Sequence, residues 1–165
     1  MSLAAETKER LLAGLDSFLR GEAATGLFRG QALPPDRLKI AFIYSGQGPQ
    51  WWRMGRELFE TAAVFREMVE RCHGLMKGYA SWSLLDEFLA DETKSRMSET
   101  AVAQPAIFVL QAALTVLLQS CGIRPAGAVG HSVGEVAAAW AAGVLTLDQA
   151  LRVIYHRGRS MDRPS

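Results

Sequence analysis

The chain has 165 residues, of which 49% are hydrophobic and 21% charged, so it is long enough and apolar enough to form one globular core. A formal net charge of +1 argues against nucleic acid and against a membrane surface as partners. The N-terminus lacks the apolar core of a signal peptide, and the apolar segment 106–118 is too short to cross a bilayer.

The N-terminal part of the chain predicts a thin unit that forms part of a connector. Apolar residues at helical spacing predict an amphipathic helix over residues 7–19, and Gly21 can end it. A short extended segment is expected at 26–30. The proline-containing segment 33–37 then predicts a linker.

Residues 39–165 alternate between predicted strands and helices, which indicates an α/β architecture. The continuous apolar run 39–45 predicts a buried strand of a parallel sheet, and a loop follows at 46–50. One helix is expected over 55–72, and another begins near Ser83.

Two further helices have recognisable ends. Pro105 is expected at the first position of a long apolar helix that runs to about Ser120, with Gly122 just beyond its end. The last helix is expected to begin at Thr146, which can form a capping box with Gln149.

The cysteines give no sign of a metal or redox site. Cys72 and Cys121 lack the spacing of either, so both are expected to be buried free thiols in a reducing cytoplasm. We therefore expect a cytoplasmic protein without a bound metal.

A serine between two glycines is the most informative motif. It reads G-H-S-V-G at 130–134, after the apolar run 125–129 and before the helix-forming run 136–142. Strand, sharp turn and helix are the context of a nucleophile elbow, in which the Ser132 hydroxyl stands above the sheet edge. The Val133 N–H would then point to a forming oxyanion. The alternative is a tight turn in which Ser132 only caps the helix.

The last helix carries a cation on its apolar face. Arg157 shares that face with Leu147, Ala150, Ile154 and Met161. A guanidinium placed there must meet an anion or lose much of its solvation. One interpretation is a structural salt bridge or a side chain that extends to solvent. The other brings Arg157 to the elbow serine, where it would bind a substrate carboxylate through two hydrogen bonds.

Together these motifs resemble the acyltransferase domain of modular type I polyketide synthases and the related malonyl-CoA:acyl carrier protein transacylases. The resemblance rests on segments in the family's order, namely the first strand and GQG loop at 40–55, Gln104-Pro105-Ala106, GHSVGE at 130–135, and Arg157. Residues 1–38 look like the tail of the linker that joins a ketosynthase to the acyltransferase. For residues 39–165 the resemblance implies the N-terminal part of an α/β-hydrolase-like core with parallel strands and a nucleophile elbow, the C-terminal part being absent.

The resemblance also implies a reaction in polyketide biosynthesis. Ser132 would take an acyl group from a coenzyme A thioester and pass it to the phosphopantetheine thiol of an acyl carrier protein. The implied partners are malonyl-CoA or a substituted malonyl-CoA, the carrier protein, and an adjoining ketosynthase in a larger polypeptide. Coenzyme A enters as part of the substrate, and no bound cofactor is implied.

The remaining site residues are implied by their places in the family's motifs. The backbone amides of Gln47 and Val133 would form the oxyanion hole. Arg157 would bind the free carboxylate of the malonyl unit, and Gln104 and His131 would line the substrate site. The valine after the serine is more typical of malonyl-type than of methylmalonyl-type domains, but it does not fix the acyl unit.

A serine nucleophile needs a base, and the family's catalytic histidine comes well downstream of the serine, beyond residue 165. His73, His131 and His156 are expected to be solvated or structural. The isolated chain is therefore expected not to transfer acyl groups at a useful rate. Two alternatives stay open: a serine esterase or thioesterase of the α/β-hydrolase type, and a non-catalytic module that docks carrier proteins.

Overall fold

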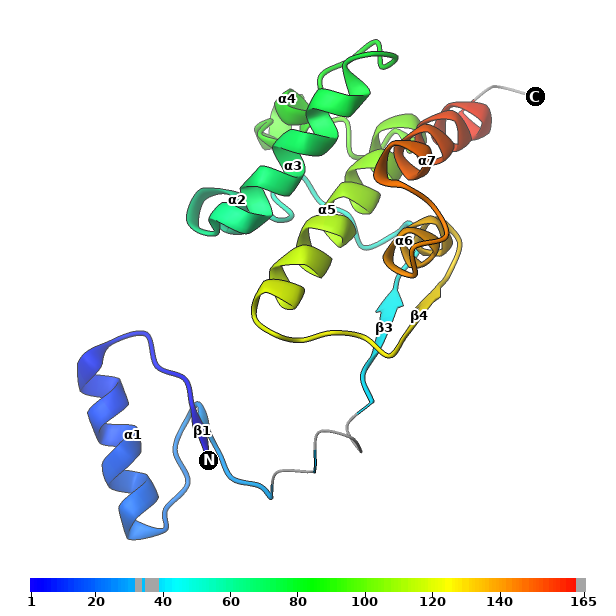
Figure 1. Ribbon diagram of the computed structural model, residues 1–165. Helices are drawn as coiled ribbons and strands as arrows, with labels where there is room; N and C mark the ends of the chain where they lie inside the picture. The colour runs from blue at the N-terminus through cyan, green and yellow to red at the C-terminus, as the bar shows by residue number, and fades with distance from the viewer. Residues whose placement is uncertain (32–33, 35–38, 163–165) are drawn as a thin grey trace. The chain divides into compact units, whose positions relative to one another are not determined.

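The computed structural model describes residues 1–31, 34 and 39–162 of the chain (Figure 1). The chain forms two compact units, residues 1–38 and residues 39–165. The second unit contains the sequence motifs described above, and its helices and strands position them.

The first unit is a helix with a small antiparallel ladder. Strand β1 (Ser2–Leu3) pairs with β2 (Leu27–Phe28), and α1 (Lys8–Arg20) lies between them in the sequence. Both the amphipathic helix and the short extended segment are confirmed. Gly21 ends α1 in the left-handed conformation, with φ 78°. Apart from residue 34, the predicted linker at 33–37 lies outside the described residues.

The second unit alternates strands with helices, and its two strands are parallel. The elements in chain order are β3 (Ala41–Tyr44), α2 (Arg56–Thr61), α3 (Ala63–Met76), α4 (Leu84–Phe88), a 3-10 turn (Glu92–Lys94), α5 (Thr100–Ser120), β4 (Gly127–Gly130), α6 (Val133–Ala141) and α7 (Leu147–Met161). The predicted α/β class with parallel strands is confirmed.

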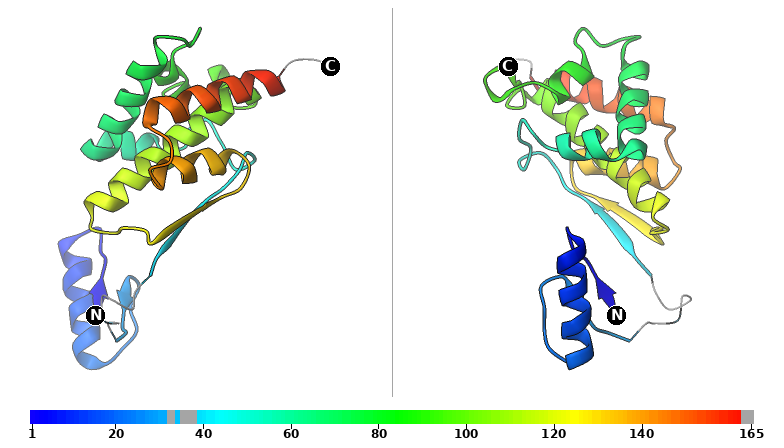
Figure 2. Two further views of the ribbon diagram at one scale, coloured as in Figure 1. Left: turned by 45° about the vertical axis from the view of Figure 1, so that its right-hand side comes forward. Right: turned by 90° about the vertical axis from the view of Figure 1, so that its left-hand side faces the viewer.

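The two parallel strands end at the same edge, with Tyr44 of β3 opposite Gly130 of β4 (Figure 2). One further hydrogen bond, from the His131 N–H to the Tyr44 carbonyl at 3.0 Å, extends the pairing into the turn. Helix α6 packs against both strands. The loop after β3 and the turn after β4 therefore start side by side, which is where parallel sheets place their ligand sites.

The prediction that the first strand is buried is wrong for one of its faces. Tyr44 is 5% exposed and faces the helices, whereas Ile43 is 81% exposed and its neighbour Val129 is 61% exposed. An apolar run on both faces is typical of a strand that is covered on both sides. The described part of the chain supplies helices for one side.

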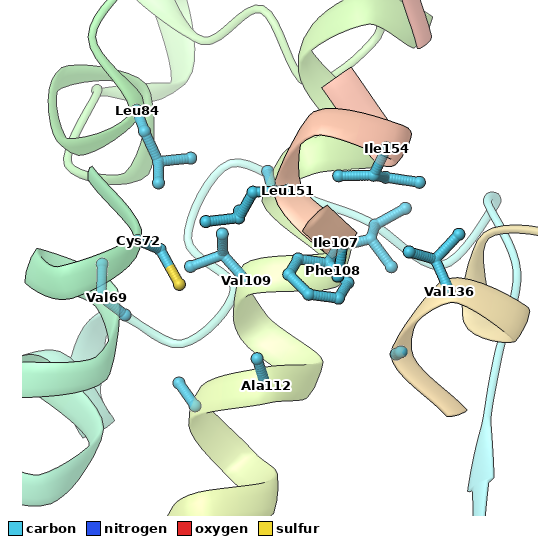
Figure 3. Close-up of a cluster of buried hydrophobic side chains, with 14 of the residues drawn as sticks. Val69, Cys72, Leu84, Ile107, Phe108, Val109, Ala112, Val136, Leu151 and Ile154 are labelled. Atoms are coloured by element: carbon cyan, nitrogen blue, oxygen red, sulfur yellow. The ribbon is translucent and has the colours of Figure 1, made fainter. Parts of the chain in front are cut away.

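Helix α5 is the centre of the core and contacts α3, α4, α6 and α7. Figure 3 shows side chains of these helices meeting around it, namely Val69, Cys72, Leu84, Val109, Leu151, Ile154, Phe108 and Val136. By length and composition alone α5 could cross a bilayer, which corrects the estimate made from its shorter apolar segment. The helix is mostly buried among its neighbours, as a core helix is.

The long helix begins earlier than predicted. Its first residue is Thr100, so Pro105 lies inside α5 rather than at its start. Proline donates no hydrogen bond and is normally disfavoured there. A contact from Asp162, the residue that follows α7, supports the early turn, because its carboxylate accepts the Ala101 N–H at 2.9 Å. That contact is not visible in any local sequence pattern.

Other helix ends are as predicted, with one exception. Ser83 caps α4, and Gly122 follows α5 with φ 82°. Thr146 caps α7 in a capping box with Gln149, whose amide oxygen accepts the Thr146 N–H at 2.9 Å. The helix predicted over 55–72 is instead two helices, α2 and α3, because Ala62 between them has extended backbone angles.

One of the two cysteines departs from its predicted burial. Cys72 of α3 is buried, and burial raises the pKa of its thiol to about 12. Cys121 is exposed, because it lies at the C-terminal cap of α5 where the core ends. The prediction of two buried thiols is therefore right for Cys72 and wrong for Cys121.

A buried hydrogen bond ties β3 to α5. The Tyr44 hydroxyl lies 2.9 Å from Thr115 Oγ1, and Thr115 Oγ1 donates to the Gln111 carbonyl at 2.7 Å. The Thr115 proton is thus used, so the Tyr44 hydroxyl donates to Thr115. Burial raises the pKa of Tyr44, which keeps this donor protonated.

Replacing Thr115 by valine should leave the Tyr44 hydroxyl buried without its acceptor. We expect Thr115→Val to lower the free energy of unfolding by about 1–3 kcal/mol, measured by urea denaturation. Adding Tyr44→Phe should recover much of this loss, since both polar groups are then gone. The control is Thr61→Val, because the exposed Thr61 makes the same type of bond, to the Glu57 carbonyl at 2.6 Å. If Thr61→Val and Thr115→Val lowered the free energy of unfolding equally, the buried Tyr44–Thr115 hydrogen bond would not be the cause of the loss.

Candidate functional site

Ser132 occupies a strained turn between β4 and α6. Among the described residues it is the non-glycine residue with a positive φ, 55°, and its ψ is −113°. Such a conformation costs on the order of 1–3 kcal/mol and persists where neighbouring structure imposes it. The Ser132 N–H donates to the Glu135 carboxylate at 3.3 Å, which ties the turn to the first turn of α6. The predicted strand–turn–helix elbow is confirmed.

The two glycines of the elbow are required by close backbone packing. A Cβ on Gly130 would overlap the backbone of Gly134. A Cβ on Gly134 would overlap the Tyr44 carbonyl at the end of β3. Because these neighbours are backbone atoms, they cannot rotate aside as a side chain would. The glycine spacing of the motif therefore allows α6 to begin directly against the sheet edge.

Arg157 reaches the elbow from α7. It is half-buried, and its guanidinium donates from Nη2 to Ser132 Oγ at 3.0 Å and from Nη1 to Gln104 Oε1 at 2.6 Å. Within residues 1–31, 34 and 39–162, the structure shows no salt bridge from this side chain. Of the two interpretations of the sequence, the structure therefore matches the one that brings Arg157 to the serine. A cation bonded to neutral acceptors beside a hydroxyl can bind an anionic group.

A buried amide connects this arginine to the loop after β3. Gln104 of α5 is 1% exposed, and its Nε2 donates to Gln47 Oε1 at 3.3 Å and contacts Met161 Sδ at 3.3 Å. Gln47 Nε2 donates in turn to Thr100 Oγ1 at 3.4 Å. These contacts join the predicted residues Gln47 and Gln104 to Arg157. Thr100 and Met161 belong to the same network but were not predicted, because neither carries a motif signal.

The loop that contains Gln47 is itself anchored by side-chain amides. Gln111 Nε2 of α5 donates to the Ser45 carbonyl at 2.8 Å, before Gln47. After it, Gln50 Oε1 accepts the Gly48 N–H at 2.7 Å. The anchors on both sides restrict where the Gln47 backbone can lie.

For the other predicted site residues, the structure gives a position but does not test the predicted role. Val133 is buried and is the first residue of α6, so its N–H has no acceptor within the helix. The roles of Gln47 and Val133 as oxyanion donors stay predictions. The His131 side chain is exposed and lies against Gly46, where an added Cβ would be 2.9 Å from His131 Nδ1. In the described part of the chain, no histidine hydrogen-bonds to the Ser132 hydroxyl.

An apolar cavity of about 420 Å³ lies next to this site but does not include it. Its walls come from β3, from the loop that follows, and from α5. Neither Ser132 nor Arg157 lines it. The site is therefore defined by the hydrogen bonds around the elbow serine rather than by this cavity.

Comparison with protein families gives one result that covers most of the chain. The family model of the acyl transferase domain matches residues 41–165. The chain is 49% identical over 123 residues to the highly reducing polyketide synthase sdnO of Sordaria araneosa. The aligned region covers 74% of this chain and 4% of that protein. It is 40% identical over 157 residues to the polyketide synthase GfsA of Streptomyces halstedii, covering 93% of this chain and 2% of that protein.

Solved structures show the same similarity. The acyltransferase domain from the second module of the salinomycin polyketide synthase matches with a TM-score of 0.84 and 37% identity, over 98% of this chain and 37% of that one. MCAT from Streptococcus pneumoniae matches with a TM-score of 0.67 and 30% identity, over 75% of this chain and 39% of that one. The chain thus spans less than half of either solved structure and a few per cent of the curated relatives.

The close packing at the elbow predicts that Gly134→Ala is strongly destabilising. The added methyl group would meet the Tyr44 carbonyl, so we expect the free energy of unfolding to fall by about 1–3 kcal/mol or more, measured by urea denaturation. Gly127→Ala in β4 is the matched control, because a Cβ at Gly127 would have no neighbour within 4 Å. Similar stabilities of the two variants would show that the contact does not constrain the turn.

Proposed function

This chain belongs to the acyl transferase domain family, and we propose that it supplies the nucleophile and the carboxylate-binding group for transfer of a malonyl-type acyl unit. The donor is a coenzyme A thioester, and the acceptor is the phosphopantetheine thiol of an acyl carrier protein within a polyketide synthase. The observation that carries this proposal is the Arg157 guanidinium 3.0 Å from Ser132 Oγ. A nucleophile beside a cation that makes no salt bridge within the described residues suits an acyl group that carries its own carboxylate.

In the first step, Ser132 Oγ attacks the thioester carbonyl. An O–C bond forms and the serine proton passes to a base, which gives it to the sulfur as the C–S bond breaks, so that coenzyme A leaves as the thiol. The carrier protein's thiol then attacks the serine ester: a C–S bond forms, the O–C bond breaks, and the thiol proton passes through the base to Ser132 Oγ, which restores the hydroxyl. The Val133 N–H at the start of α6 and the Gln47 N–H would stabilise the oxyanion in both steps.

Arg157 would recognise the distal carboxylate of the acyl group. Both terminal nitrogens of its guanidinium now donate to neutral oxygens, those of Ser132 and Gln104. A carboxylate is a stronger acceptor for this planar pair of donors. Arginine at this position favours acyl transfer from a dicarboxylic thioester over the esterase alternative, since a simple ester has no group for it to bind.

The mechanism also needs a general base. Among the described residues, no side chain that could act as a base is hydrogen-bonded to Ser132 Oγ. Loss of the base from a serine enzyme costs on the order of 10⁶ in turnover. We therefore expect slow transfer by the 165 residues alone. Because we propose that the chain acts within a longer polyketide synthase polypeptide, the functional tests use that polypeptide.

Substitutions in the natural polypeptide test the two roles separately. Ser132→Ala should abolish the mass increase that malonyl-CoA produces on the intact protein. Arg157→Ala should lower kcat/KM for malonyl-CoA by about 10- to 150-fold, since a hydrogen-bonded charge is lost, and should affect acetyl-CoA little. Arg152→Ala is the control, because Arg152 is on the same helix but exposed and paired with Asp148.

Two outcomes would contradict the proposal. One is an equal effect of Arg157→Ala on malonyl-CoA and acetyl-CoA, which would remove the carboxylate-binding role. The other is hydrolysis of neutral esters that depends on Ser132 but not on Arg157. That second result would support the esterase alternative.

A further inference from the structure

We propose that Gly158 is a positioning residue for Arg157. Its lack of a side chain lets α7 approach the first turn of α5 closely enough for the neighbouring guanidinium to reach Ser132. Gly158 would thereby set the preference of the site for acyl groups that carry a carboxylate. This inference rests on the proposed function of Arg157.

The contact at Gly158 is between backbones. Gly158 is buried in α7, and an added Cβ would lie 3.0 Å from the Thr100 carbonyl oxygen and 3.1 Å from the Ala101 Cα. Both distances are shorter than ordinary van der Waals contact, and neither neighbour can rotate away. A side chain here would move the two helices apart by a few tenths of an ångström.

Local helix propensity does not explain a glycine at this position. In a helix interior, glycine is less favourable than alanine. Gly158 has no positive φ in the structure, so no turn requires it. The feature that does require it is the approach of α5.

A second contact between the two helices lies just past the end of α7, one turn beyond Gly158. The Asp162 carboxylate accepts the Ala101 N–H at 2.9 Å. This N–H belongs to the first turn of α5, where backbone donors have no acceptor within the helix, and the N-cap residue Glu99 makes no capping bond with its side chain. We call the contacts of Gly158 and Asp162 with Thr100 and Ala101 the α5–α7 junction.

The α5–α7 junction controls where the guanidinium lies, because Arg157 directly precedes Gly158. The two hydrogen bonds of Arg157 end on different elements, Ser132 at the elbow and Gln104 on α5. Moving α7 away from α5 would lengthen the bond to Gln104 and would displace the guanidinium from its place beside Ser132. Misplacement by 1 Å of a group that positions a substrate can cost 10²-fold in rate, so a few tenths of an ångström are measurable.

The test compares Gly158→Ala with Gly74→Ala in the natural polypeptide. Gly74 lies in α3, and a Cβ there would have no neighbour within 4 Å, so it matches the substitution without the clash. The measurement is kcat/KM for malonyl-CoA and for acetyl-CoA. We expect Gly158→Ala to lower the malonyl-to-acetyl ratio by roughly threefold to tenfold, mainly through KM for malonyl-CoA, and Gly74→Ala to leave it unchanged.

The outcomes separate positioning from a merely structural role. A proportional loss on both substrates, or no change in the ratio, would overturn the proposal. If Gly158→Ala does not fold, Asp162→Ala loosens the same junction and should lower the ratio, while Asp162→Asn should restore it because an amide oxygen still accepts the Ala101 N–H. An unchanged ratio in Asp162→Ala would then overturn the proposal.

The same assay distinguishes this inference from the proposed function. If Arg157→Ala leaves the ratio unchanged, the proposed function of Arg157 fails. If Arg157→Ala lowers the ratio and Gly158→Ala does not, only the role of Gly158 fails.

Discussion

The packing of Gly134 against the Tyr44 carbonyl is the constraint on which the site depends. It brings the start of α6 against the end of β3, directly after Ser132, whose φ is positive. The loop after β3 then starts beside the elbow, which puts Gln47 within reach of α5. A side chain at position 134 would separate these parts, so the approach of the elbow to the loop after β3 depends on this glycine.

The second organising interaction is electrostatic. Arg157 is held in the fold by neutral oxygens, and the buried amide of Gln104 orients it. Gln104 is the buried member of this network, and a buried amide whose hydrogen bonds are made holds its partners in place. Because the described residues form no salt bridge with Arg157, its guanidinium can bind an anionic group. Similarity to polyketide synthase acyltransferase domains agrees with this chemistry, and the proposed role of the site follows from both.

Features that depend on neighbours in the sequence were predictable. The elbow follows from glycines two residues either side of Ser132, and the capping box of α7 follows from Thr146 and Gln149. The end of α1 follows from Gly21. In each case the interacting atoms lie within a few residues, so a short pattern contains the whole interaction. The apolar position of Arg157 on α7 also indicated a cation that needed a partner.

Features that depend on distant segments were not predictable. At the early start of α5 the Ala101 N–H donates to the distant Asp162, and the glycine at position 158 is explained only by the approach of α5. Likewise, the exposure of Ile43 depends on which face of β3 receives helices. The sequence therefore specified the strand–turn–helix elbow, the helix caps and the chemical groups of the site through local backbone sterics and hydrogen bonds. The distance from Arg157 to Ser132 was set only by packing between helices, because that packing joins residues remote along the chain.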